Sequence, residues 1–219
     1  MSNLDTLIIM IGFFAGVLLL FTVHPRTRFS TTRLKIKRAN PAPWSMSEFL
    51  NTKSSQVAIN QHYYFSEEIV RSLGHRYIGR LDGAVLHWKE VPILDCVIEF
   101  KFPVSILPRR VRAEDLFQSG LYALALLESG VSCSSTMLVI VYCLQEKAKR
   151  CQSRKSTKLC WECCDGKTFV RRFKSKKVIG ELHRLDEVWY NGRQPKPTRE
   201  LSSCRICPYS RNRCKYSLV

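Results

Sequence analysis

The stretch from Ile93 to Phe102 (ILDCVIEFKF) constrains the fold most, because it is short, mostly apolar and bounded by Pro92 and Pro103. A run of this length between prolines is typical of a central strand. Asp95 lies at its start, and the charged residues Glu99 and Lys101 interrupt it near its end. Burying charge in a central strand is costly, so this interruption needs an explanation.

The segments around this strand predict a mixed α/β domain. Two runs rich in β-branched and aromatic residues, 63–73 and 76–86, flank Gly74-His75 and predict an antiparallel hairpin. Residues 113–128 begin with acidic residues, carry apolar residues at helical spacing and are followed by Gly130, which predicts an amphipathic helix. The remaining predicted elements are a short helix at 44–51 capped by Ser45, strands at 137–144 and 168–173, and a helix at 175–190. The predicted fold class is α/β, with a mixed central sheet flanked by helices.

The N-terminal run from Thr6 to Val23 has 18 residues without a charge. That is the minimum for a helix that crosses a bilayer, and the flanking residues do not suit a secretory signal peptide. We therefore expect a transmembrane anchor over 1–23, a basic juxtamembrane linker over 24–40 and a globular domain over 41–219. Six basic residues follow the run before the first acidic one, which predicts a single-pass membrane protein with its C-terminal domain in the cytoplasm.

The chain carries a formal net charge of +17. The excess is greatest in residues 147–177, where 12 Lys or Arg residues face only Glu162 and Asp165. Such a balance favours nucleic acid or anionic lipid as a partner. A solvated loop explains a charge run of this kind equally well.

The interrupted strand offers a specific chemistry. Glu99 and Lys101 are two residues apart, so their side chains share one face of the sheet, and Asp82 can reach that face from the neighbouring hairpin strand. Asp82, Glu99 and the backbone carbonyl of Phe100 could bind a hard divalent cation, Mg²⁺ or Mn²⁺. The metal would activate water, and Lys101 would offset the negative charge of a phosphodiester during hydrolysis. For an E-x-K pattern without further support, a simple ion pair is the better account.

The order of motifs supplies that further support. Gly79-Arg80-Leu81-Asp82 is followed by Ile98-Glu99-Phe100-Lys101 and then by Gln118-x-x-x-Tyr122 on the predicted helix. This set resembles the PD-(D/E)XK nuclease superfamily, and within it the RecB-like exonuclease group that includes the CRISPR-associated iron–sulfur exonuclease. The resemblance runs from about residue 62 to 214 and implies a restriction-endonuclease-like fold. It further implies metal ligation by Asp82 and Glu99, catalysis by Lys101, and support of the site and the DNA by Gln118 and Tyr122.

His62 and Asp95 are two further candidates for the site. Members of the group often have an upstream histidine, and His62 is the best-placed candidate here, although a structural role explains it equally well. Asp95, at the start of the central strand, is an additional carboxylate without an assigned role.

The C-terminal cysteines extend the resemblance. Cys204-x-x-Cys207-x₆-Cys214 resembles the cluster that holds a [4Fe-4S] centre in the same group, together with one upstream cysteine. In this chain no cysteine precedes Cys96, so the upstream ligand is missing from its place. The fourth ligand could come from Cys151, Cys160, Cys163 or Cys164; alternatively, these residues form a separate zinc site or a metal-free loop.

Together these features predict a metal-dependent DNA exonuclease that acts at DNA ends or on single strands, in DNA repair or recombination or in CRISPR spacer acquisition. The expected partners are DNA, a membrane, and other DNA-processing or CRISPR adaptation proteins. Two alternatives stay open. One is a catalytically inactive, membrane-tethered module that binds nucleic acid, and the other is a membrane-bound zinc or redox protein built around the cysteines.

Overall fold

The computed structural model of the chain describes residues 10–14, 31–52, 56–151, 160, 163, 165–194, 201–210 and 214–219. The chain divides into two compact units, Met1–Val178 and Ile179–Val219. The first unit contains the whole sheet, and the second contains most of α5 and the C-terminal cysteines.

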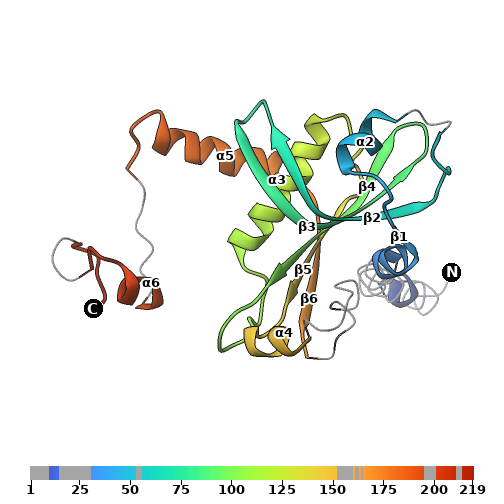
Figure 1. The fold of residues 1–219 in the computed structure, drawn as a ribbon. Coiled ribbons are helices and arrows are strands. Elements are labelled where there is room, and N and C mark those ends of the chain that lie inside the picture. Colours follow the sequence, from blue (N-terminus) through green and yellow to red (C-terminus); the bar gives the residue numbers. More distant parts are fainter. Residues whose placement is uncertain are drawn as a thin grey trace. The chain divides into compact units, whose positions relative to one another are not determined.

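A six-stranded mixed sheet organises the first unit (Figure 1). Its strands lie in sequence order, and the pairs β1–β2 and β4–β5 are parallel while the others are antiparallel. The strands are β1 (Asn40–Pro41), β2 (His62–Ser72), β3 (Tyr77–Trp88), β4 (Pro92–Lys101), β5 (Met137–Tyr142) and β6 (Lys167–Arg172). The predicted hairpin and central strand are confirmed, and the fold is mixed α/β.

Three helices follow local signals in the sequence, whereas the helices at 145–151 and 201–206 were not predicted. Helix α3 (Ala113–Glu128) has the predicted bounds, and Ser45 forms a capping box with Glu48 at the start of α2. The helices are α2 (Met46–Asn51), α3 (Ala113–Glu128), α4 (Gln145–Cys151), α5 (Ser175–Trp189) and α6 (Leu201–Ile206).

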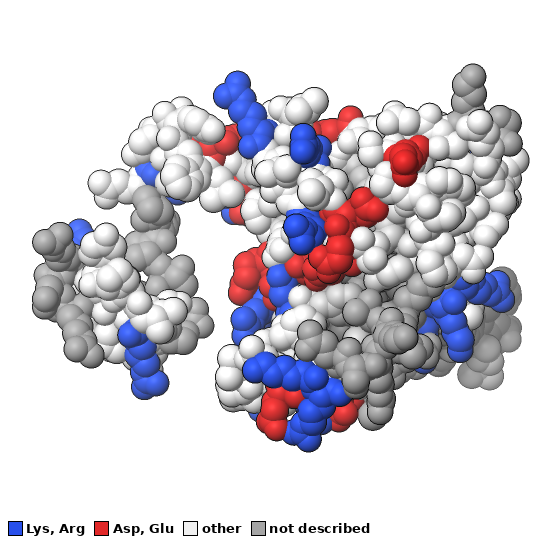
Figure 2. Space-filling view, viewed as in Figure 1, with Lys and Arg blue, Asp and Glu red and all other residues white. Residues whose placement is uncertain are grey.

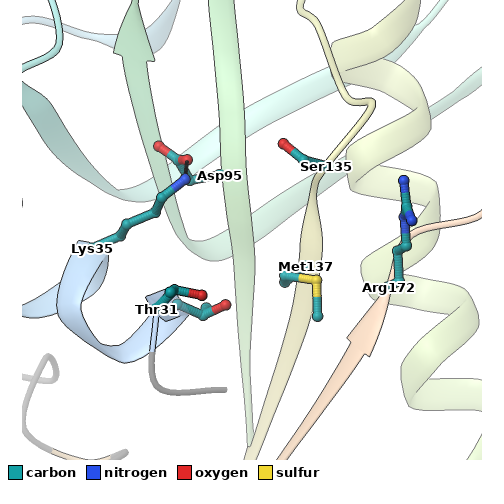
Figure 3. A pocket seen from close by; sticks show the side chains of 7 residues that line it. Thr31, Lys35, Asp95, Ser135, Met137 and Arg172 are labelled. Atoms are coloured by element: carbon teal, nitrogen blue, oxygen red, sulfur yellow. Dashed lines mark hydrogen bonds and ion pairs between the residues drawn. The ribbon is translucent and has the colours of Figure 1, made fainter. Parts of the chain in front are cut away.

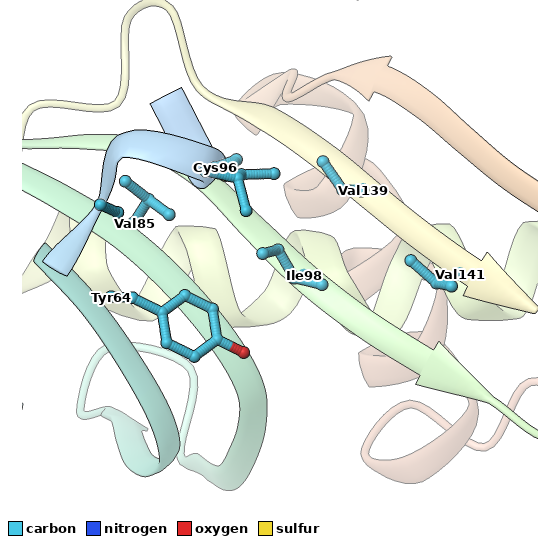
Figure 4. Close-up of a cluster of buried hydrophobic side chains, with 8 residues drawn as sticks. Tyr64, Val85, Cys96, Ile98, Val139 and Val141 are labelled. Carbon is cyan, nitrogen blue, oxygen red and sulfur yellow. The ribbon is translucent and has the colours of Figure 1, made fainter. Parts of the chain in front are cut away.

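Residues 31–38, which the sequence analysis places in a linker, form a helix that packs on the sheet. Ile36 and Ala39 are buried in a core with residues of β2 to β5 (Figure 4). Thr32, Ile36 and Ala39 are spaced as one face of a helix, and all three are buried. The basic residues between them hide this short periodicity in the sequence. On the other face of the sheet, α3 contacts β2, β3, β4 and β5.

The prediction of a transmembrane anchor, and with it of a single-pass membrane protein, is wrong. Among the described residues no helix is long and apolar enough to cross a membrane. Within Thr6–Val23 the described helical residues are 10–14, and the remainder of that run lies outside the described residues. An uncharged run of minimal length permits a span without requiring one.

Candidate active site

Strands β3 and β4 and helix α3 bring the predicted catalytic residues together. The Phe100 amide of β4 donates a hydrogen bond of 2.6 Å to Asp82 Oδ2 on β3. On the same face, Lys101 Nζ lies 2.9 Å from Glu99 Oε1. Lys101 also donates a hydrogen bond of 2.7 Å to Gln118 Oε1 on α3. The two carboxylates, the ammonium and the helix thus form one connected site.

Tyr122 completes this network from one helical turn further along α3. Gln118 Nε2 donates a hydrogen bond of 2.7 Å to the Tyr122 hydroxyl, so the carboxamide joins the tyrosine to Lys101. The Tyr122 ring lies directly over Gly79 of β3, and a Cβ at that position would stand 2.5 Å from Cε1 of the ring. Glycine is therefore required at residue 79 for this close approach of α3.

Glu99 is the most constrained member of the site. Its residue is only 2% exposed, and Oε2 is buried with no hydrogen-bond partner among the described residues. Burial raises the pKa of Glu99 to about 7, and the nearby charge of Asp82 adds to the increase, although the hydrogen bond from Lys101 opposes it. A buried carboxylate oxygen without a partner is costly, and a divalent cation would satisfy it. The residues present therefore fit a hard metal ion.

The charges of the neighbouring residues support the same interpretation. Burial raises the pKa of Asp82 above its ordinary value, against the effect of the Phe100 amide. Burial by itself would lower the pKa of Lys101, but its hydrogen bond to Glu99 and the surrounding carboxylates outweigh that effect and raise it. Lys101 is thus held as a cation beside carboxylates that lack full solvation, and perturbed pKa values of this kind cluster at functional sites.

The structure adds residues that the sequence analysis missed. Asp115 lies 3.7 Å from Lys101 Nζ and accepts a hydrogen bond from the Tyr142 hydroxyl at the end of β5. The sequence could have indicated Asp115, because it lies three residues before Gln118 on a predicted helix and residues three apart share a face. Arg109 and Arg110, in the loop that leads to α3, are exposed near this end of the sheet.

His62 is not brought to these residues. It pairs with His87 across β2 and β3, five residues along β3 from Asp82, or roughly 16 Å. His62 lies instead beside Asp95 on β4, with its Nε2 3.4 Å from Asp95 Oδ2. The two acidic residues of β4, Asp95 and Glu99, therefore belong to different clusters.

Apart from the buried Cys96 and Cys133, the described cysteines lie in two groups, one in each unit. In the first unit, burial raises the pKa of Cys143, and the nearby thiols of Cys163, Cys160 and Cys151 add to the increase. Cys143 was not among the predicted ligands. In the second unit, the amide of Cys207 donates to the carbonyl of Cys204. Cys164 lies outside the described residues, and among the described cysteines no three sulfurs lie within 4.8 Å of one another.

Comparison with known proteins adds no relative. No protein-family model matches the chain, and a search of the curated proteins returns no match. The function is therefore inferred from the geometry of the residues described above.

Proposed function

We propose that this protein is a Mg²⁺- or Mn²⁺-dependent deoxyribonuclease whose active site consists of Asp82, Glu99, Lys101, Gln118 and Tyr122. The observation that carries the proposal is Glu99: its carboxylate is buried, one oxygen has no partner in the described part of the chain, and the other faces Lys101. An ion pair formed only for stability would not leave a buried carboxylate oxygen unsatisfied.

Asp82 and Glu99 would hold the metal ion, together with the carbonyl of Phe100 and water. When bound, the ion supplies an activated water and neutralises charge on the scissile phosphate. The chain itself fixes this arrangement before substrate arrives. The Phe100 amide orients the Asp82 carboxylate, and Lys101 orients that of Glu99.

Lys101 would stabilise the negative charge that develops on the phosphate and position the attacking water. Its ammonium is held by Gln118 at 2.7 Å and by Glu99 at 2.9 Å, so it has little freedom to turn away. Tyr122 in turn holds Gln118. Preorganisation of this kind lets Lys101 act without a costly rearrangement during the reaction.

Basic residues beside the site favour a nucleic-acid substrate. Helix α4 starts directly after β5, and the amide of Cys143 between them donates to the carbonyl of Lys101. Lys149 and Arg150 of α4, and Arg109 and Arg110 before α3, are exposed, and Arg150 pairs with Glu146. Acidic side chains are interspersed with Lys and Arg on the face shown in Figure 2, so DNA contact would be confined to such local groups.

The proposal has three further parts. The enzyme would act at DNA ends or on single strands, and it would serve in repair, recombination or CRISPR spacer acquisition. Cys204, Cys207 and Cys214 would bind a [4Fe-4S] cluster. They depend on the motif resemblance. The turn in which Cys207 donates to Cys204 and Ser210 donates to Cys207 is compatible with a metal-bound cysteine pair.

The test is a cleavage assay on end-labelled single- and double-stranded DNA with Mg²⁺ or Mn²⁺. The full chain should cut, and Asp82→Ala and Lys101→Ala should each lower the rate by at least about a hundredfold, because each loss removes several kcal/mol of charge stabilisation. Glu90→Ala, which removes a carboxylate from an exposed position between β3 and β4, is the control and should cut normally. Equal cleavage by all four proteins would show that these residues are not the active site, and no cleavage by the full chain would favour a DNA-binding or cysteine-based function without catalysis.

A further inference from the structure

A second cluster of ligating side chains lies at the other end of β4. It consists of His62 on β2, His87 on β3 and Asp95 on β4, and one ligand atom from each lies within 4.8 Å of the other two. His87 Nδ1 is 2.7 Å from Asp95 Oδ2, and His62 Nε2 is 3.4 Å from the same oxygen. The two imidazole rings are 4.9 Å apart.

The sheet builds this cluster through two local features. His62 and His87 are direct cross-strand partners, so their side chains share one face. Opposite Val85 and Leu86, the register skips Asp95, which makes it the extra residue of a β-bulge. Bulges re-aim side chains, and this one turns the Asp95 carboxylate toward the two histidines.

Lys35 of the helix formed by residues 31–38 pairs with the other carboxylate oxygen, Asp95 Oδ1 (Figure 3). Oδ2 is therefore left to face the imidazoles. Asp95 and Lys35 also line a pocket of about 270 Å³ that reaches Thr31 and Arg172. Neither His62 nor His87 lines this pocket, so the histidine cluster lies on the other side of the Asp95 carboxylate.

A hydrogen-bonded network does not account for all of these contacts. His62 Nε2 is buried and makes no hydrogen bond to any described residue, although it lies beside a carboxylate. If Nε2 is unprotonated, its lone pair faces a negative oxygen. A cation between them would satisfy both groups, and protein-bound Zn²⁺ takes imidazole nitrogen and carboxylate oxygen at about 2.0–2.2 Å.

We propose that His62, His87 and Asp95 bind one Zn²⁺ ion, with water as the fourth ligand. Tetrahedral ligands at that bond length are about 3.3 Å apart. His62 Nε2 and Asp95 Oδ2 are 3.4 Å apart, and His87 Nδ1 would move outward from its hydrogen-bond distance of 2.7 Å to bind the ion. Asp95 lies four residues before Glu99, or roughly 13 Å along β4, so this site is distinct from that of Asp82 and Glu99. Nitrogen ligands also favour zinc over Mg²⁺. The ion would join β2, β3 and β4 and, through Lys35, the helix at 31–38.

The test counts zinc in the full chain by elemental analysis after dialysis against limiting Zn²⁺. His62→Gln and His87→Gln should each bind one fewer zinc ion per chain than the wild-type protein. Because both variants keep every cysteine, the difference counts this site even if the cysteines also bind metal. His75→Gln controls for the loss of a histidine, and Lys35→Met, which breaks the ion pair but keeps all three ligands, should retain the ion.

Cobalt substitution provides a second measurement that does not depend on the stability of the variants. The wild-type spectrum should contain a nitrogen–oxygen ligand-field component that persists when the thiols are blocked. Equal zinc content in wild type, His62→Gln and His87→Gln would refute the site. A cobalt spectrum that disappears completely on blocking the thiols would refute it as well.

Discussion

At the scale of single residues, Glu99 links stability to pH. Its pKa is about 7 in the fold, against an ordinary value of 4.5, because burial disfavours the anion. Between these two pH values the folded chain retains a proton that the unfolded chain has lost. The free energy of unfolding should therefore fall as the pH rises from about 4.5 to 7, by on the order of 3 kcal/mol.

Urea unfolding in metal-free buffer at pH 5 and pH 8 measures this effect. Wild type should lose stability relative to Glu99→Gln over that interval, since the amide has no proton to lose. Added Mn²⁺ should reduce the difference at pH 8, because the metal binds the ionised form. Parallel pH profiles for the two proteins would show that Glu99 is not held in an apolar environment.

At the scale of secondary-structure elements, the contact between Gly79 on β3 and Tyr122 on α3 sets the distance between sheet and helix. A Cβ at residue 79 would stand 2.5 Å from the ring. Gly79→Ala should displace Tyr122, and with it Gln118, at a cost of about 1–3 kcal/mol in stability and a marked fall in cleavage rate. Gly180→Ala is the control, because no atom of the described residues lies within 4 Å of the point where its Cβ would stand, and alanine favours a helix. Thermal unfolding and the cleavage assay report the two effects.

The turn after α6 is a second element with a testable role. Under the proposed function, Cys204, Cys207 and Cys214 bind a [4Fe-4S] cluster with one more thiolate. Anaerobic purification should then yield a brown protein with about four iron atoms per chain, and Cys207→Ser should lose them. Stoichiometric zinc without iron would replace the cluster with a zinc site.

Strong local patterns allowed the elements to be predicted from sequence. Runs rich in β-branched and aromatic residues on either side of Gly74-His75 predicted β2 and β3, and acidic residues before an apolar periodicity predicted α3. The helix at 31–38 was missed because its buried face consists of only Thr32, Ile36 and Ala39 among basic residues. The N-terminal run misled because length and apolarity do not distinguish a membrane span from other uses of an apolar segment.

The candidate sites were predictable to different degrees for a similar reason. Asp82, Glu99 and Lys101 lie on adjacent strands with a regular register, so alternation places them on one face. The contact of Asp95 with the two histidines could not be predicted in this way, because a bulge redirects its side chain and no periodicity in the sequence marks the bulge. The role of Asp115 was not predicted because its contact with Lys101 depends on how α3 packs against the sheet.

At the scale of the whole molecule, cleavage and binding should separate. Under the proposed function, several Lys and Arg residues in local groups would contact the phosphates, so no single active-site residue should control affinity for DNA. Binding should weaken steeply between about 50 and 200 mM salt, by the same factor in wild type and in active-site variants. Fluorescence anisotropy with a labelled single strand measures this directly.

The most direct test of the central claim is the cleavage rate of Glu99→Gln, which keeps the volume of the side chain and removes its charge. On the same labelled DNA, with Mg²⁺ and with Mn²⁺, the rate should fall at least about a hundredfold while the affinity for DNA and its salt dependence match those of wild type. Cleavage by Glu99→Gln at the wild-type rate with both metals would contradict the assignment of Glu99 as a metal ligand and the nuclease function built on it.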